Sequence, residues 1–122
     1  MIRTLAALLL IATGMCLAQT QQPSVEAHLG RGTQLMQDHL FEAAATEFEQ
    51  AQAVNPADPR AHFQFAACLL ALGRNDEART QFEQVRKLAG ETRYVTYYLG
   101  RLDLLSNDYP SAIKRLASVA DG

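Results

Sequence analysis

The sequence predicts an all-α protein, a solenoid in which three antiparallel helix pairs stack on one another. Three observations favour this fold class: alanine and leucine are frequent, apolar residues recur at helical spacing, and one pattern returns every 34 residues. Its clearest copy is residues 41–56, FEAAATEFEQAQAVNP. Ala44, Phe48 and Ala51 fall on one helical face there, and Pro56 ends the helix.

Composition excludes several other classes. The chain has 122 residues, 48% of them hydrophobic and 20% charged, which is typical of a folded globular domain. The net charge of -2 carries no signature of nucleic-acid binding. The sequence contains no glycine-rich phosphate loop, no CxxC and no HExxH. We therefore expect no cofactor, no metal and no enzymatic activity.

Residues 1–18 (MIRTLAALLLIATGMCLA) have the organisation of a secretory signal peptide. Arg3 supplies positive charge, an apolar run follows, and small residues precede a cleavage point at Gln19. The apolar run is shorter than the roughly 20 residues of a membrane-spanning helix. Export to a bacterial periplasm or cell envelope is thus predicted, with no membrane span after cleavage; an uncleaved N-terminal anchor is the alternative.

Cys16 raises a second alternative, a lipid anchor. Met15 stands where a lipoprotein has glycine or alanine, so a lipidated Cys16 is the less favoured prediction. After the signal peptide, the polar residues 19–24 predict a short disordered leader.

Capping residues and breakers then delimit six helices. The expected ranges are 25–37, 41–54, 59–72, 76–89, 92–105 and 109–120. The expected N-caps are Ser24, Asp58, Asn75 and Asp108. Gly73 and Asn107, one period apart, suit left-handed turn positions. The turns are short, so neighbouring helices are expected to be antiparallel.

The repeated residues resemble the tetratricopeptide repeat, a 34-residue helix–turn–helix unit. Small residues recur in both helices of each pair, and a large apolar residue follows in the second helix. The small residues are Gly32, Ala66 and Gly100 in the first helices and Ala44, Ala78 and Ala112 in the second. The large residues are Phe48, Phe82 and Leu116, with Pro56 closing the first repeat. Small residues let paired helices approach closely, and large ones fill the space beside that contact.

The resemblance implies a right-handed superhelix with repeats at 25–58, 59–92 and 93–122 and no capping helix after the third. Some residues depart from the family pattern. His28, His62 and Thr96 replace a large apolar residue, and Asp103 is polar at an expected core position. The two histidines are expected to fill packing positions rather than bind metal, because stacked helices lie about 8–10 Å apart. Acidic residues of the second helices, Glu47 among them, are expected to form a solvated outer face.

In this family the first helices line a concave groove, so the resemblance implies a non-enzymatic scaffold that binds a protein or peptide there. The groove residues carried over are Leu29, Thr33, Arg60, Phe63, Tyr94, Tyr97 and Arg101. Aromatic and arginine side chains dominate binding hot spots, although Leu29 and Phe63 could instead pack against the next repeat. The basic clamp with which some relatives hold acidic chain ends is absent here.

A second function remains open in the sequence. The third pair is expected to expose Ile113, Leu116 and Val119, because no further helix follows them. Three explanations are open: the sequence is a fragment of a longer array, this face joins another copy of the chain, or the last helix is only partly stable. The alternative function is therefore a structural subunit that self-associates into a homo-oligomer.

Overall fold

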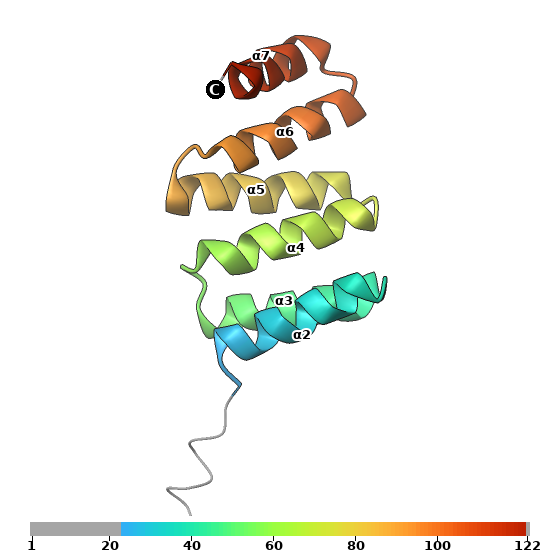
Figure 1. Cartoon of the computed structure of the whole chain (residues 1–122), viewed down its shortest axis with the longest axis vertical. Helices are drawn as coiled ribbons and strands as arrows, with labels where there is room; N and C mark the ends of the chain where they lie inside the picture. The colour runs from blue at the N-terminus through green and yellow to red at the C-terminus, as the bar shows by residue number, and fades with distance from the viewer. Residues whose placement is uncertain (1–22, 122) are drawn as a thin grey trace, which may run out of the picture.

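The computed structural model describes residues 23–121, in which six α-helices stack as three antiparallel pairs along one axis (Figure 1). The helices are α2 (Val25–Gln37), α3 (Phe41–Val54), α4 (Pro59–Ala71), α5 (Asn75–Ala89), α6 (Arg93–Leu105) and α7 (Tyr109–Ala120). The pairs are α2 with α3, α4 with α5 and α6 with α7, and successive pairs meet through α3–α4 and α5–α6. The described part contains no strand, so the predicted all-α class is confirmed.

Several predictions concern residues that the structure does not describe. The expected signal peptide at 1–18, the Cys16 lipid anchor and all but the end of the 19–24 leader lie outside the described residues. None of the described helices is long and apolar enough to cross a membrane.

Side-chain caps begin four of the helices. Ser24 accepts a hydrogen bond from the Ala27 amide, at 3.1 Å, at the start of α2. Asp58 caps α4 with Pro59 at the first helical position, and Asp108 caps α7. These caps satisfy amide groups that have no partner inside the helix, and all three were predicted. Thr92 caps α6, although the sequence predicted it as the first residue of that helix.

The predicted Asn75 cap is wrong. Asn75 is the first residue of α5, and Arg74 occupies the N-cap position without a side-chain cap. The reason lies in the turn: Gly73 has φ +75°, and the Arg74 amide donates back to the Leu69 carbonyl at 2.9 Å. The turn closes so tightly that the Arg74 carbonyl already accepts the first helical hydrogen bond of α5. Leu72, predicted as the end of α4, is its C-cap.

The same left-handed turn recurs in every pair. His39, Gly73 and Asn107 have φ of 59°, 75° and 61°, and each lies 34 residues from the next. Glycine and asparagine adopt this conformation readily, which is why the last two were predicted. His39 was not predicted, because histidine carries a weaker signal for it. The repeated turn geometry keeps the two helices of each pair in the same relative register.

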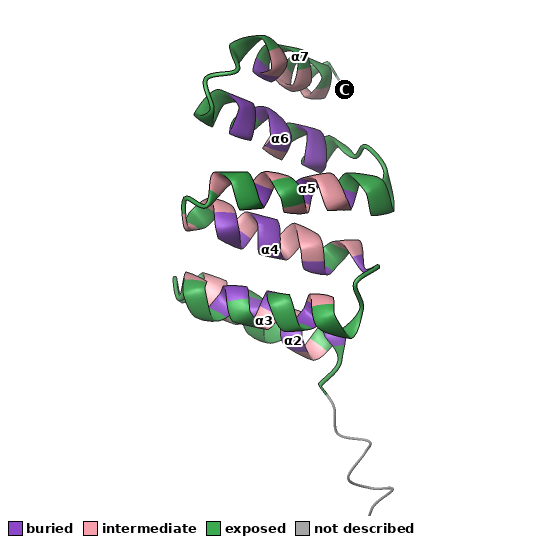
Figure 2. Ribbon diagram, turned by 180° about the vertical axis from the view of Figure 1, so that it is seen from behind, coloured by how far each residue is buried: buried purple, intermediate pink, exposed green. Residues whose placement is uncertain are grey.

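Glycine and alanine bring the paired helices into contact. A Cβ added to Gly32 would lie 2.4 Å from the Phe48 ring, and one added to Gly100 would lie 2.9 Å from the Leu116 side chain. Buried residues occur on every helix of the stack (Figure 2). Fully buried at 0% exposure are Ala44, Phe48, Ala66, Ala78, Phe82 and Ala112. The small residue of one helix thus receives the large side chain of its partner, as the repeat pattern predicted.

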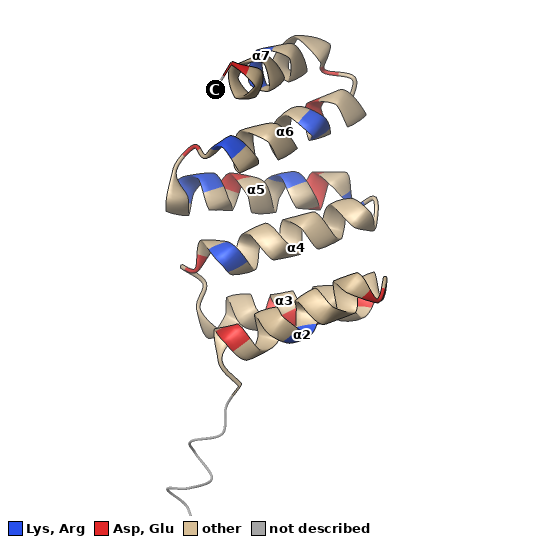
Figure 3. Cartoon of the chain, viewed as in Figure 1, with Lys and Arg blue, Asp and Glu red and all other residues tan. Residues whose placement is uncertain are grey.

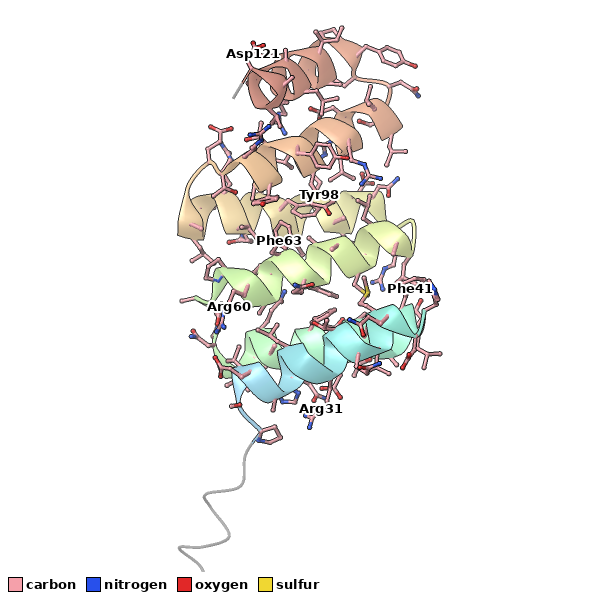
Figure 4. All side chains as sticks on the ribbon, in the orientation of Figure 1. Arg31, Phe41, Arg60, Phe63, Tyr98 and Asp121 are labelled. Carbon is pink, nitrogen blue, oxygen red and sulfur yellow. The ribbon has the colours of Figure 1, made fainter. Side chains whose placement is uncertain are left out.

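Each junction between repeats is filled differently. Val25, Ala51 and Ala61 form a small apolar cluster between the first and second pairs. Between the second and third pairs, Phe63 and Tyr98 point toward one another (Figure 4), with ring centroids 5.5 Å apart. Both rings also contact Phe82: Phe63 edge-on at 5.6 Å and Tyr98 stacked at 5.0 Å. Three aromatic rings therefore stabilise the second junction, and Tyr98 was missed in the sequence.

Asp103 is buried, as its core position implies, at 3% exposure. Arg79 of α5 lies 2.8 Å from one carboxylate oxygen, and Arg115 Nε of α7 lies 3.5 Å from the other. A buried carboxylate requires such partners because desolvation otherwise penalises its charge. Asp103 consequently links three helices by charge at a position where Leu35 and Leu69 occupy the other repeats.

Candidate functional site

Two shallow hollows lie along the first helices of the second and third pairs. The first, here called the α4–α6 hollow, has a volume of about 350 Å³. Its lining residues are Pro59, Arg60, Phe63, Gln64, Val85, Thr92 and Tyr94. The structure therefore brings together three of the predicted groove residues, Arg60, Phe63 and Tyr94.

The second hollow, here called the tyrosine hollow, has a volume of about 460 Å³. Its lining residues are Arg93, Tyr94, Tyr97, Tyr98 and Val119. Tyr94 lines both hollows, so they adjoin and form one track. Tyr94 and Tyr97 are 71% and 41% exposed, which leaves their rings free for a ligand.

Arg101 extends the tyrosine surface with a positive charge. Its guanidinium carbon lies 5.8 Å from the ring centroids of both Tyr97 and Tyr98. The two rings contact each other edge-on, with centroids 5.4 Å apart. The cation–π contacts orient the exposed guanidinium, so that less side-chain freedom would be lost on binding.

Leu29 and Thr33 lie outside both hollows, and Arg60 is held by ion pairs. Leu29 is half-buried and packs against the apolar cluster between the first and second pairs. Thr33 is exposed on α2 and lines neither hollow. Arg60 lines the α4–α6 hollow, but its guanidinium is 2.6 Å from Asp58 and 2.9 Å from Glu26. Hydrogen bonds to Asp58 and then Glu26 raise the pKa of Arg60. The aromatic track is thus confined to α4 and α6.

His28 and His62, which occupy equivalent places in the first two repeats, are packed against hydrogen-bond acceptors. His28 is 5% exposed, and its Nδ1 lies 2.8 Å from Glu47 Oε2. One period later, His62 Nδ1 lies 2.8 Å from Gln81 Oε1. Within residues 23–121, no group of three or more histidine, cysteine, aspartate or glutamate side chains could hold a metal ion. Glu47 is therefore half-buried against His28 rather than part of the solvated outer face that was predicted.

The contact between His28 and Glu47 predicts an acid-sensitive first repeat. The hydrogen bond from His28, with a smaller contribution from Arg31, holds the pKa of Glu47 below its ordinary value of 4.5. The Glu47 carboxylate therefore binds a proton more readily in the unfolded chain than in the folded one. Its contribution to the free energy of unfolding is present above pH 4.5 and is lost as the pH falls through the pKa of the folded state. We expect Glu47→Gln to flatten the decline in unfolding free energy between about pH 5 and 3, measured by urea denaturation.

Glutamine suits this substitution because Gln81 occupies the same place beside His62. Glu49→Gln is the control, since it removes one negative charge from the exposed face of the same helix. An equal change in the pH slope for both variants would contradict the assignment to the His28 contact.

Stacked helix pairs with a 34-residue period define a helical-repeat protein. The sequence model of the tetratricopeptide repeat matches residues 35–96, about half of the chain. The chain belongs to the tetratricopeptide-repeat family. Two uncharacterized TPR repeat-containing proteins of Arabidopsis thaliana are 31% identical over 65 residues, or 53% of this chain. The chain spans only 8% of the length of these relatives.

Solved structures show the same fold. YrrB, described as a TPR protein with an unusual peptide-binding site, superposes with a TM-score of 0.74 at 24% identity, over 85% of this chain and 54% of its own. The second TPR of Spaghetti (RPAP3), bound to an HSP90 peptide, superposes with a TM-score of 0.74 at 17% identity. That match covers 84% of this chain and 95% of the Spaghetti chain. At these identities, the likeness establishes the fold alone.

Proposed function

We propose that the protein is a non-enzymatic scaffold that holds a peptide or protein segment along the track formed by the α4–α6 hollow and the tyrosine hollow. The exposed ring of Tyr94, shared by both hollows, is the observation that carries this proposal. Tyrosine offers a large rigid surface with a polar tip, and it loses little conformational freedom on binding. Two structures with the same fold support this type of binding: YrrB is described as having a peptide-binding site, and the second TPR of Spaghetti (RPAP3) is bound to an HSP90 peptide.

The track suits a segment that is partly apolar. Phe63 and Val85 contribute apolar surface to the α4–α6 hollow, and the tyrosines contribute ring faces to the next one. Arg101, held beside Tyr97, can donate hydrogen bonds to backbone carbonyls or to an acidic side chain of the segment. Affinity would therefore come from ring burial, and orientation from the guanidinium.

We expect Tyr97→Ala combined with Arg101→Ala to weaken partner capture about tenfold or more, because both side chains belong to hot-spot residue types. The measurement is capture by the immobilised full chain from a cell-envelope extract, with the captured proteins identified and quantified by mass spectrometry. Tyr109→Ala is the matched control, since Tyr109 is a 56% exposed tyrosine on α7 that lines neither hollow. Unchanged capture by the folded double variant would overturn the proposal.

Self-association is the second candidate function, and the exposure of Ile113 favours it. Ile113 is 68% exposed on α7, beside the half-buried Leu116 and Val119. A large exposed aliphatic side chain commonly marks a contact surface when it adjoins other apolar residues. Sedimentation of residues 19–122 tests this candidate: a clean monomer would exclude it. If Ile113→Ser and Leu116→Ser abolish capture while Tyr97→Ala with Arg101→Ala does not, assembly through this face is the better account.

The cellular location is also proposed. Residues 1–18 support export and cleavage before Gln19, with the folded repeats acting in a periplasm or cell envelope. N-terminal sequencing of the protein recovered from a bacterial envelope fraction tests this. An intact Met1, or a lipid-modified Cys16 at the new N-terminus, would contradict cleavage before Gln19.

A further inference from the structure

A third and larger opening, here called the basic cleft, lies between the α5–α6 connection, α6 and α7. It has a volume of about 680 Å³. Its lining residues are Glu91, Arg93, Thr96, Ser111, Lys114, Arg115, Ser118 and Val119. Neither the repeat pattern nor the aromatic track accounts for a polar opening at this place.

The previous repeat shows what normally fills this place. At the junction of the first and second pairs, Gln52 of α3 donates to Gln81 of α5 at 2.9 Å. His62 contacts the same Gln81 oxygen at 2.8 Å and also the Pro56 carbonyl at 2.7 Å. Hydrogen bonds between amide and imidazole side chains thus connect α3, α4 and α5 and fill the space between these helices.

One period later, this network cannot form. Arg86 and Arg115 stand in place of Gln52 and Gln81, and arginine has donors but no acceptor. Arg86 pairs instead with Glu83 of its own helix at 2.8 Å. Thr96, in place of His62, is too short to span the same distance. The cleft is therefore the space that the missing network leaves.

The substitutions also make the cleft positive. Relative to the second repeat, Arg93 replaces Pro59 and Lys114 replaces Thr80. Neither Arg93 nor Lys114 forms an ion pair with any residue in the described range. Lysines and arginines occur on α5, α6 and α7 along this part of the stack (Figure 3). Glu91 contributes the one carboxylate among the lining residues.

Arg115 has hydrogen-bonding capacity that its neighbours do not use. Its Nε lies 3.5 Å from Asp103 Oδ2, and both this oxygen and the Nη1 of Arg115 are buried without a hydrogen-bond partner among residues 23–121. Arg115 therefore brings to the cleft wall a positive charge and donors that its neighbours leave unused, and its side chain is 32% exposed. Thr96 and Ser111 place hydroxyl groups along the same walls, whereas the Ser118 hydroxyl donates to the Arg115 carbonyl at 2.6 Å.

We propose that the basic cleft is a binding site for a phosphoryl group. A phosphoryl group offers three strong acceptor oxygens and up to two negative charges, which suit a guanidinium, an ammonium and hydroxyl donors better than one carboxylate does. The group could belong to free phosphate or to a phosphorylated residue of a partner. This site is distinct in chemistry from the aromatic track, although both openings share Arg93 and Val119.

Calorimetric titration of the full chain at constant ionic strength tests the proposal. One arm uses inorganic phosphate; the other uses a phosphoserine peptide, with the same peptide in unphosphorylated form as its control. We expect phosphate or the phosphopeptide to bind with a dissociation constant of about 1 mM or tighter. Stronger binding of inorganic phosphate identifies a small anion as the source, and stronger binding of the phosphopeptide identifies a modified partner. No heat of binding in either arm, or equal binding of the unphosphorylated peptide, would overturn the proposal.

Two variants locate the binding. Lys114→Thr restores the residue of the second repeat at an exposed position and is expected to weaken binding about tenfold. Lys87→Thr is the matched control, because Lys87 is an exposed lysine of α5 that does not line the cleft. Equal weakening by both would show a general charge effect and would reject the site.

A third variant tests the cleft without relying on net charge alone. Thr96→His with Arg115→Gln rebuilds the His62–Gln81 pair of the second repeat, while Arg86 stays in place and Arg79 still pairs with Asp103. Binding is expected to be lost while the helical circular dichroism stays unchanged. Undiminished binding by this folded variant would contradict the proposal.

Discussion

Replacing Phe82 by alanine is expected to lower the free energy of unfolding by about 3–5 kcal/mol, the usual cost of removing a buried phenylalanine ring. Phe82 has no exposed surface, and its ring contacts both Phe63 and Tyr98. The substitution removes one member of the aromatic junction and leaves a cavity between the second and third pairs. Urea denaturation followed by circular dichroism measures the loss.

The arrangement of repeats sharpens this expectation. In a repeat array, the free energy of unfolding is approximately the sum of the stability of each repeat and the interaction free energy between neighbouring repeats. A weakened junction therefore also lowers the cooperativity of unfolding. A broader or biphasic transition is therefore expected for Phe82→Ala. Tyr94→Ala is the matched aromatic control, since its side chain is 71% exposed and its loss should change stability by about 0.5 kcal/mol or less. A cost for Phe82→Ala no greater than that of Tyr94→Ala would contradict this account of the junction.

Adding one methyl group at Gly32 is expected to destabilise the first pair by about 1–3 kcal/mol, because it overpacks a closed contact. The new Cβ of Gly32→Ala would lie 2.4 Å from the Phe48 ring, and that ring is itself fully buried. The ring cannot move aside without displacing its own neighbours. Thermal and urea denaturation of the variant measure the effect.

Gly30 provides the control on the same helix. A Cβ added at Gly30 meets nothing within 4 Å, so Gly30→Ala should stabilise the chain by about 0.5–1 kcal/mol through helix propensity alone. Opposite signs for the two substitutions are the expected result. If Gly32→Ala were also stabilising, α2 and α3 would have to pack less closely than they do here.

The aromatic track was predicted only in part. The repeat register correctly indicated that Arg60, Phe63, Tyr94 and Tyr97 lie on the first helices, since residues 34 apart occupy equivalent places. It did not reveal Tyr98, because Gly30 and Gln64 occupy the same position in the other repeats and show no shared pattern. It also grouped Leu29 with the track, whereas α4 packs beside Leu29 and half-buries it.

The basic cleft could not be predicted because it depends on an interaction that does not form. In the sequence, Arg86, Thr96 and Arg115 are unremarkable polar residues of amphipathic helices. Only the structure shows that their equivalents one repeat earlier join across the junction, and that arginines cannot do the same. The role of these residues becomes visible only when the junction between the first and second pairs is compared with the junction between the second and third.

The helices, their pairing and the 34-residue period follow from the sequence, because caps, breakers and apolar spacing act over a few residues and recur in each unit. The sequence also indicated which small and large residues meet, since Gly32 and Phe48 lie in fixed positions of the repeat. The packing of each junction, in contrast, depends on the tertiary structure: a small aliphatic cluster of Val25, Ala51 and Ala61 lies between the first and second pairs, and three aromatic rings meet between the second and third. Junction packing depends on the shapes and hydrogen-bonding groups of side chains from neighbouring repeats, and no local pattern encodes that match.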